Sequence, residues 1–312
     1  MKASIAKFWN QPYLLLVLTN LFWAGNAVVG RYLAGAMPPV TISALRVTLS
    51  TLLFVTFVFP QMKREWPQAK KHIGYLLLLA VCGVIGYNLL TYWALNYTTA
   101  VNATLINSTS PLVIGLMAYL VLKEHLSLRF LLSVLLSMVG IVWVVFQGSL
   151  ERLLTLQFNR GDLLMLVAVF SWAIYSVTLP KIANRFTLFS LFGYCLVLAS
   201  LISLLFAAVE LHFKAIRSFG LDVGLSLLYL AIFPSLCSFL FWNRATALVG
   251  PAKGSLFINL TAVFAALFGY LFLGETLTLA QLMGGLLVFL GVFLASSSKD
   301  KQEVGKAEKS VT

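Results

Sequence analysis

Ten stretches of mostly apolar residues divide this chain of 312 residues, and short polar or basic breaks separate them. A segment of ~20 apolar residues is long enough to cross the hydrocarbon core of a bilayer as a helix. In lipid every backbone N–H and C=O must find a partner within the spanning structure, and a helix meets that need inside one segment. The expected spans are 12–33, 40–60, 73–95, 100–122, 128–147, 161–181, 187–209, 222–246, 252–273 and 278–296.

Composition agrees with a membrane protein. The chain is 60% hydrophobic and 10% charged, whereas a soluble domain carries roughly 25% charged residues. The net charge of +12 is spread over short segments between apolar runs, so we expect no nucleic-acid partner. Cys82, Cys195 and Cys237 lie far apart inside apolar runs, without disulfide or metal spacing. No phosphate-binding loop or His-Glu-x-x-His motif occurs, so we expect neither a cofactor nor an enzyme.

The chain also repeats itself at a spacing of about 151 positions. Residues 116–140 and 267–291 share leucines, a tyrosine, a glutamate and a glycine at matching places, including Glu124 with Glu275. A weaker echo, shifted by 149, links Phe22-Trp23-Ala24 to Ser171-Trp172-Ala173. The expected organisation is an N-terminus (1–11), a first five-helix repeat (12–147), a linker (148–160), a second five-helix repeat (161–296) and a charged tail (297–312).

The distribution of basic residues predicts the orientation. If the N-terminus is cytoplasmic, sixteen Lys and Arg fall on the inner side and five on the outer side. The outer five are Arg31, Arg152, Arg160, Lys214 and Arg217. Because cytoplasmic loops are enriched in Lys and Arg, we expect a plasma-membrane protein with both termini on the cytoplasmic side. Five spans per copy is an odd number, so the two copies must be inverted, as in many transporters.

Several short motifs resemble the drug/metabolite transporter superfamily, and specifically its ten-span EamA-type branch of bacterial exporters. They are Leu21-Phe22-Trp23-Ala24-Gly25-Asn26, Ala44-Leu45-Arg46, Tyr92-Trp93-Ala94-Leu95, Ser110-Pro111, Leu122-Lys123-Glu124-His125-Leu126, Phe241-Trp242 and Leu273-Gly274-Glu275-Thr276-Leu277. The resemblance covers about residues 12–296. It implies a helical basket around a central cavity, and alternating access that exports amino acids or other metabolites across the bacterial inner membrane. Two departures are Ala24 in place of a glycine and the lack of a proline near Ala262, which would straighten the ninth span.

Polar and aromatic side chains inside the spans are the candidate binding residues. An amide that faces lipid costs several kcal/mol, so these groups must face other helices or a hydrated cavity. Hydrogen bonds between helices, worth ~0.6 kcal/mol each, are the alternative for any single residue. The substrate-binding candidates are Trp23, Asn26, Tyr87, Asn88, Thr91, Asn107, Trp172, Tyr175, Ser238, Trp242 and Asn259.

A second group has candidate gating or structural roles: Arg46, Pro111, Glu124, Pro234 and Glu275. Arg46 is expected to reach out to water or to carbonyls at helix ends; the alternative is that it attracts anionic substrate groups. The two prolines are expected to bend their spans, as static kinks or as hinges. The two glutamates are expected as anchors at the membrane edge, with a gate or proton site as the alternative. Small-residue faces in the fifth and tenth spans suit internal packing or a homodimer.

The sequence therefore predicts an all-α membrane protein of ten helices that carries a small molecule. Because no Asp or Glu lies at mid-span, a facilitator or exchanger is favoured over a proton-driven carrier. Alternative cargoes are organic cations and nucleotide sugars. A different class, a non-transporting accessory membrane protein, would not need a polar, aromatic interior.

Overall fold

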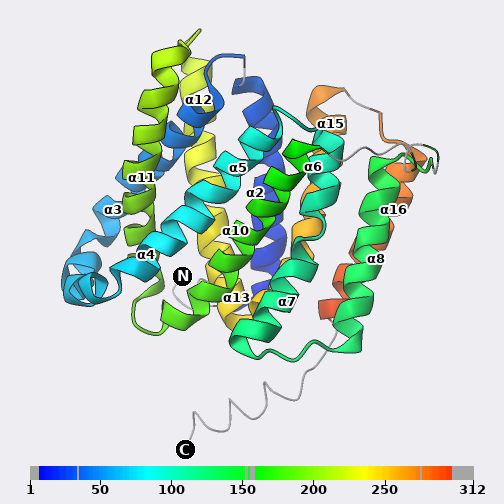
Figure 1. Ribbon diagram of the computed structural model, residues 1–312, viewed down its shortest axis with the longest axis horizontal. Coiled ribbons are helices and arrows are strands. Elements are labelled where there is room, and N and C mark those ends of the chain that lie inside the picture. Colours follow the sequence, from blue (N-terminus) through cyan, green and yellow to red (C-terminus); the bar gives the residue numbers. More distant parts are fainter. Residues whose placement is uncertain are drawn as a thin grey trace, which may run out of the picture.

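The computed structural model describes residues 7–33, 35–149, 151, 154, 159–274 and 276–296, and the regular elements in this part of the chain are all helical (Figure 1). Ten of its helical segments are long and apolar enough to cross a membrane. The predicted all-α class with ten spans is therefore confirmed. Glu275, residues 1–6, most of the linker 148–160 and the tail 297–312 lie outside the described residues.

Each half of the chain supplies five of these spans. The first half contains α2 (Pro12–Leu33), α3 (Pro39–Lys71), α4 (Ile73–Leu79), η1 (Ala80–Gly86), α5 (Tyr87–Ala94), α6 (Ala100–Asn107), α7 (Ser110–Leu122) and α8 (Leu128–Val145). The second half contains α10 (Arg160–Ala183), α11 (Leu188–Phe213), α12 (Leu221–Leu230), η2 (Ala231–Cys237), α13 (Ser238–Val249), α14 (Pro251–Ser255), η3 (Leu256–Asn259), α15 (Leu260–Leu273) and α16 (Leu279–Ser296).

Helix neighbours in one half are matched in the other. The first span, α2, packs against α13 and α15, and the sixth span, α10, packs against α5 and α7. The pair α3 and α11 flanks these central helices on one side, and the pair α8 and α16 flanks them on the other (Figure 1). Each central helix therefore packs against helices of the other half, so a cavity between them is built by both halves.

The second span is longer than expected. The prediction ended it at residue 60, before the basic stretch from Lys63 to Lys71, but α3 continues to Lys71 with Pro60 and Pro67 inside it. Its 33 residues make a helix of about 50 Å, which exceeds the ~30 Å hydrocarbon core. Met62 and Ala69 are buried in this extension while Lys63 is exposed, so the added turns are amphipathic rather than a loop.

The long helices α3 and α11 cap each other. Near the start of α3, the backbone N–H of Thr41 donates to the Glu210 carboxylate of α11 at 2.8 Å. Near the start of α11, the N–H of Thr187 donates to the Glu65 carboxylate of α3 at 3.2 Å. Each carboxylate thus satisfies a backbone N–H that has no partner inside its own helix. The start of each helix lies beside the far end of the other, so the two run antiparallel.

A similar antiparallel contact joins α8 and α16. A Cβ placed on Gly284 would lie 2.5 Å from the carbonyl oxygen of Gly140, and one on Gly291 would lie 2.2 Å from Oγ of Ser137. The small residues predicted for packing or dimerisation thus pack against each other within the chain. Because α3 with α11 and α8 with α16 are equivalent spans of the two halves, their opposite directions support the predicted inversion.

The third and eighth spans change to a π-helix at equivalent positions. Residues Ala80–Gly86 form η1 and Ala231–Cys237 form η2, and both ends of these segments differ by the 151 positions of the sequence repeat. A π-helix leaves the i→i−4 pattern, so hydroxyls supply replacement bonds: Ser171 donates to the Cys82 carbonyl at 3.0 Å and Ser235 to the Leu230 carbonyl at 2.8 Å. Such segments occur frequently at functional sites.

The fourth and ninth spans are interrupted, which corrects two expectations. Pro111 does not bend a continuous helix, because α6 ends at Asn107 and Pro111 lies in the first turn of α7. There the missing N–H leaves no bond broken. The ninth span is not a single straight helix either. Ala262 lies in regular α15, but the 3₁₀ segment η3 interrupts the span just before it.

Candidate functional site

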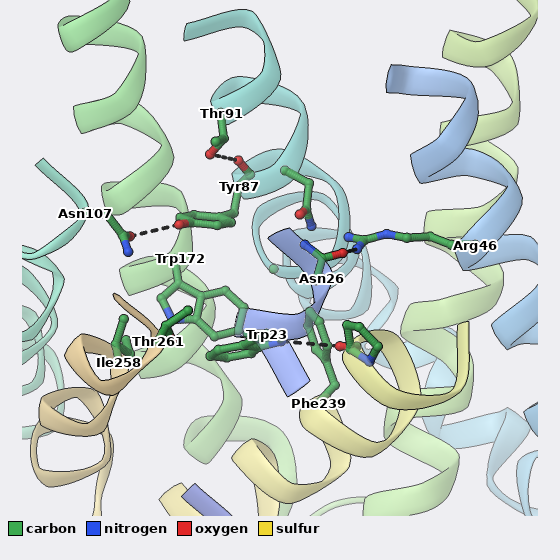
Figure 2. A pocket seen from close by; sticks show the side chains of 13 residues that line it. Trp23, Asn26, Arg46, Tyr87, Thr91, Asn107, Trp172, Phe239, Ile258 and Thr261 are labelled. Carbon is green, nitrogen blue, oxygen red and sulfur yellow. Dashed lines mark hydrogen bonds between the residues drawn. The ribbon is translucent and has the colours of Figure 1, made fainter. Parts of the chain in front are cut away.

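A cavity of about 210 Å³ lies between the two halves, at the interruptions of the spans. Side chains from α2, α3, α5, α6, α10, α13 and α15 and from the irregular segments η1, η2 and η3 surround it (Figure 2). Its lining residues are Trp23, Asn26, Arg46, Gly83, Tyr87, Asn88, Thr91, Asn107, Trp172, Pro234, Phe239, Ile258 and Thr261. None of these described lining residues is acidic.

Aromatic rings close one end of the cavity. The ring centroids of Trp23 and Trp172 are 5.4 Å apart at an interplanar angle of 82°, and Trp172 lies 5.6 Å from Phe239. Indole Nε1 of Trp23 donates to the Pro234 carbonyl at 3.3 Å, which ties the floor to η2. We call Trp23, Trp172 and Phe239 the aromatic floor. The two tryptophans come from equivalent positions of α2 and α10, so both halves build it.

A glycine allows the floor to form. A Cβ on Gly83 of η1 would lie 2.1 Å from the Tyr175 ring, which is closer than real Cβ contacts. The Tyr175 ring in turn stacks on Trp172, with centroids 5.0 Å apart and planes at 22°. Any side chain at position 83 would push Tyr175 away and remove the support of Trp172.

Neutral polar groups form one wall of the cavity. The Tyr87 hydroxyl donates to Oδ1 of Asn107 at 2.8 Å, joining α5 to the end of α6. Nδ2 of Asn88 donates to the Val84 carbonyl at 3.2 Å, and the Thr91 hydroxyl donates to the Tyr87 carbonyl at 2.7 Å. Since a hydroxyl or an amide has further hydrogen-bonding capacity, these groups retain donors and acceptors for a solute.

Arg46 lies opposite that wall and points into the cavity (Figure 2). Nη1 donates to Oδ1 of Asn26 at 2.8 Å, the side chain is 4% exposed, and Nε has no hydrogen-bond partner. The expectation that this side chain reaches to water or to carbonyls at helix ends is therefore wrong. Position 46 is seven residues into α3, about 10 Å along the helix axis, and the guanidinium turns inward from there.

Four predicted binding residues do not line the cavity: Tyr175, Ser238, Trp242 and Asn259. They lie beyond or beside the floor and are nearly inaccessible, with Trp242 at 0% and Tyr175 at 1% exposure. The Tyr175 hydroxyl donates to Oδ1 of buried Asn243 at 2.7 Å, and Ser238 donates to the Thr19 carbonyl at 3.3 Å. Nε1 of Trp242 and Nδ2 of Asn259 have no partner, although buried polar groups are usually hydrogen-bonded.

The remaining gating candidates have separate surroundings. Pro234 lies inside η2 and lines the cavity. Glu124 follows the end of α7, and its carboxylate lies beside Gly250, where a Cβ would be 3.0 Å from Oε1. Its equivalent in the sequence repeat, Glu275, lies outside the described residues.

Sequence reasoning missed several contributors. Gly83, Phe239 and Ile258 carry no polar signal that distinguishes them from filler in an apolar run. Thr261 and Asn243 are polar residues inside spans, so the rule that selected the candidates would have found them. Thr261 donates to Oδ1 of Asn20, a third overlooked polar residue, at 2.8 Å.

Comparison with known proteins gives one consistent result. The chain matches the EamA-like transporter family over residues 10–146 and 159–297. A Bacillus subtilis (strain 168) protein named "Uncharacterized transporter YyaM" is 26% identical over 285 residues, which cover 91% of this chain and 93% of the relative. An "Uncharacterized transporter" of Archaeoglobus fulgidus is 28% identical over 290 residues, covering 93% and 99%. One solved crystal structure superposes with a TM-score of 0.74 at 20% identity, covering 91% of this chain and 96% of the other, and shows the same fold.

Proposed function

This chain belongs to the EamA-like transporter family, and we propose that it is a secondary transporter that exports amino acids or related small metabolites across the plasma membrane. The observation that carries the proposal is the cavity between the two halves. Its lining mixes amides, hydroxyls and indole rings within spans that are otherwise apolar. A chain with only a structural role in the membrane has no need for such a polar, aromatic interior.

Alternating access is the proposed mechanism. The aromatic floor separates the cavity from the end of the bundle that holds Lys181, Arg185 and Arg244, which basic-residue counting assigns to the cytoplasm. The residues beyond the floor, such as Tyr175 and Trp242, are buried, whereas Asn26, Asn88 and Thr91 on the other side are half-buried. The structure therefore suits a state that is closed towards the cytoplasm. Rearrangement at η1, η2 and η3 would open the cytoplasmic side and close the outer one.

Size and charge favour this cargo class over the alternatives. A volume of about 210 Å³ is below the ~300–1,000 Å³ of sites for drug-sized ligands, which disfavours a nucleotide sugar. No described lining residue is an acid that would hold an organic cation.

Counterflow in proteoliposomes tests the proposal. Vesicles that contain the purified protein are preloaded with a panel of amino acids, carboxylic-acid metabolites and amines, and uptake of the labelled compound is followed. At least one preloaded solute is expected to accelerate uptake of the labelled compound relative to protein-free vesicles. The reason is that an exchanger that carries unlabelled solute out of the vesicle can carry labelled solute in on its return. Absence of acceleration across the whole panel would remove the carrier assignment and favour an accessory membrane protein.

A further inference from the structure

The cavity contains a buried positive charge that no carboxylate in the described part of the chain compensates. Arg46 has one recorded partner, the neutral amide oxygen of Asn26, and its Nε has none. No described carboxylate lies within ion-pair distance of its guanidinium. A charged side chain inside a membrane protein normally pairs with an opposite charge or faces a functional pathway, so the missing partner needs an explanation.

The acidic side chains on helices around Arg46 are already engaged elsewhere. Glu210 of α11 accepts from Thr41 and lies 3.8 Å from Lys214. Asp222 of α12 accepts a hydrogen bond from the Tyr32 hydroxyl. Glu65, the acidic residue of α3 itself, lies at the far end of that helix, where its carboxylate accepts a hydrogen bond from the Thr187 backbone N–H. The fold thus provides other partners for these carboxylates and leaves Arg46 facing the cavity.

We propose that the cargo carries a carboxylate, and that Arg46, oriented by Asn26, binds it inside the cavity; this inference rests on the transport function proposed above. A guanidinium offers a fork of N–H donors that matches a carboxylate, and Nε is one of the unused donors here. The aromatic floor receives the rest of the solute, because indole faces pack well against apolar or planar groups.

This assignment makes the carboxylate necessary and an ammonium group optional. For an ammonium the cavity offers only neutral acceptors, such as Oδ1 of Asn107, and ring faces. An amine without a carboxylate would enter beside the charge of Arg46 and meet no negative group. Carboxylic acids and amino acids are therefore cargo, and the corresponding amines are not.

Matched triads of solutes separate these cases. Phenylpropionate, phenylalanine and phenethylamine share one body and differ in carboxylate and ammonium, and parallel triads carry an indole or a branched alkyl body. Binding to the purified protein is measured by tryptophan fluorescence, and counterflow by uptake into proteoliposomes. In at least one triad, the acid and the amino acid are expected to bind about tenfold or more tightly than the amine, as is typical of a hydrogen bond to a charged group.

Two variants assign that preference to Arg46. Arg46→Gln is expected to lose the carboxylate preference, whereas Arg64→Gln, which removes an exposed arginine from the same helix, keeps it. Asn26→Asp is nearly isosteric and places a carboxylate beside Arg46, where Oδ1 of Asn26 now accepts from Nη1 at 2.8 Å. It is expected to lose acid binding while its melting temperature stays the same or rises, so it remains informative if Arg46→Gln folds poorly.

Each outcome decides the matter. Amines that bind as tightly as their acids, or acid binding that survives in Asn26→Asp, overturn the role of Arg46 but leave the carrier function intact. No exchange by any member of any triad, together with none in the wider panel, overturns the carrier function and the role of Arg46 with it.

Discussion

Trp172 links the cavity to the packed region beneath it. Its ring contacts Trp23, Phe239 and Trp242 and stacks on Tyr175. One side of this cluster faces the solute space and the other faces buried rings. Under the proposed transport function, this position would let Trp172 contact cargo and also keep the cavity closed at that end.

Replacing this indole should weaken transport without removing the protein from the membrane. We expect Trp172→Ala to lower affinity in counterflow by up to about tenfold, since aromatic contacts contribute roughly 0.5–1.5 kcal/mol beyond area burial. Trp172→Phe should retain most of that affinity. The matched control is Trp66→Ala, which removes an exposed indole from the α3 extension. Equal kinetics for Trp172→Ala and the native protein would remove Trp172 from the binding site.

Helical periodicity predicted which residues share a helix face, but not whether a side chain on that face lines the cavity or is buried beneath it. Trp172 and Tyr175 are three residues apart and share a face, as expected, yet one lines the cavity and the other lies beneath the floor. That difference depends on which end of the bundle is closed, which a single sequence does not encode. For Arg46, sequence reasoning left an outward reach and an inward, anion-attracting role open, because the contact with Asn26 that accompanies the inward turn is a tertiary one.

At the scale of elements, apolar runs predicted the spans well because the bilayer sets their length. The irregular segments were not predicted, since carbonyls of η1 and η2 accept hydrogen bonds from side chains of other helices, Ser171 and Trp23, which a linear pattern does not bring together. The basic stretch from Lys63 to Lys71 did not end α3, because the amphipathic extension continues to bury Met62 and Ala69 on its other face.

The close approach of α8 and α16 gives a sharp test of packing. Gly284→Ala should lower the melting temperature strongly, because the added Cβ would lie 2.5 Å from the Gly140 carbonyl oxygen, and overpacking costs about 1–3 kcal/mol or more. Gly74→Ala is the matched control, since nothing lies within 4 Å of the added atom. A melting temperature of Gly284→Ala equal to that of the control would contradict this helix contact.

The orientation of the whole molecule makes the next prediction. After replacement of Cys82, Cys195 and Cys237 by serine, a single new cysteine is introduced at Lys214 or at Lys181, both exposed positions. The positive-inside rule places position 214 outside and position 181 inside. In intact cells an impermeant maleimide should therefore label Lys214→Cys and not Lys181→Cys, with both labelled after lysis. The reverse pattern would invert the assigned topology.

Under the proposed alternating access, the lone guanidinium would also make the carrier sensitive to voltage. At the 149-residue shift that relates Trp23 to Trp172, position 46 corresponds to Cys195, so the charge has no twin in the other half. A cation in a water-filled hollow feels the potential of whichever compartment the hollow adjoins, and one charge across 100 mV is worth about 2.3 kcal/mol. A polarised, inside-negative cell would thus hold the empty protein facing its interior. A monoanion would cancel the charge and release that bias, so in the proposed mechanism the electric field would favour loading from within.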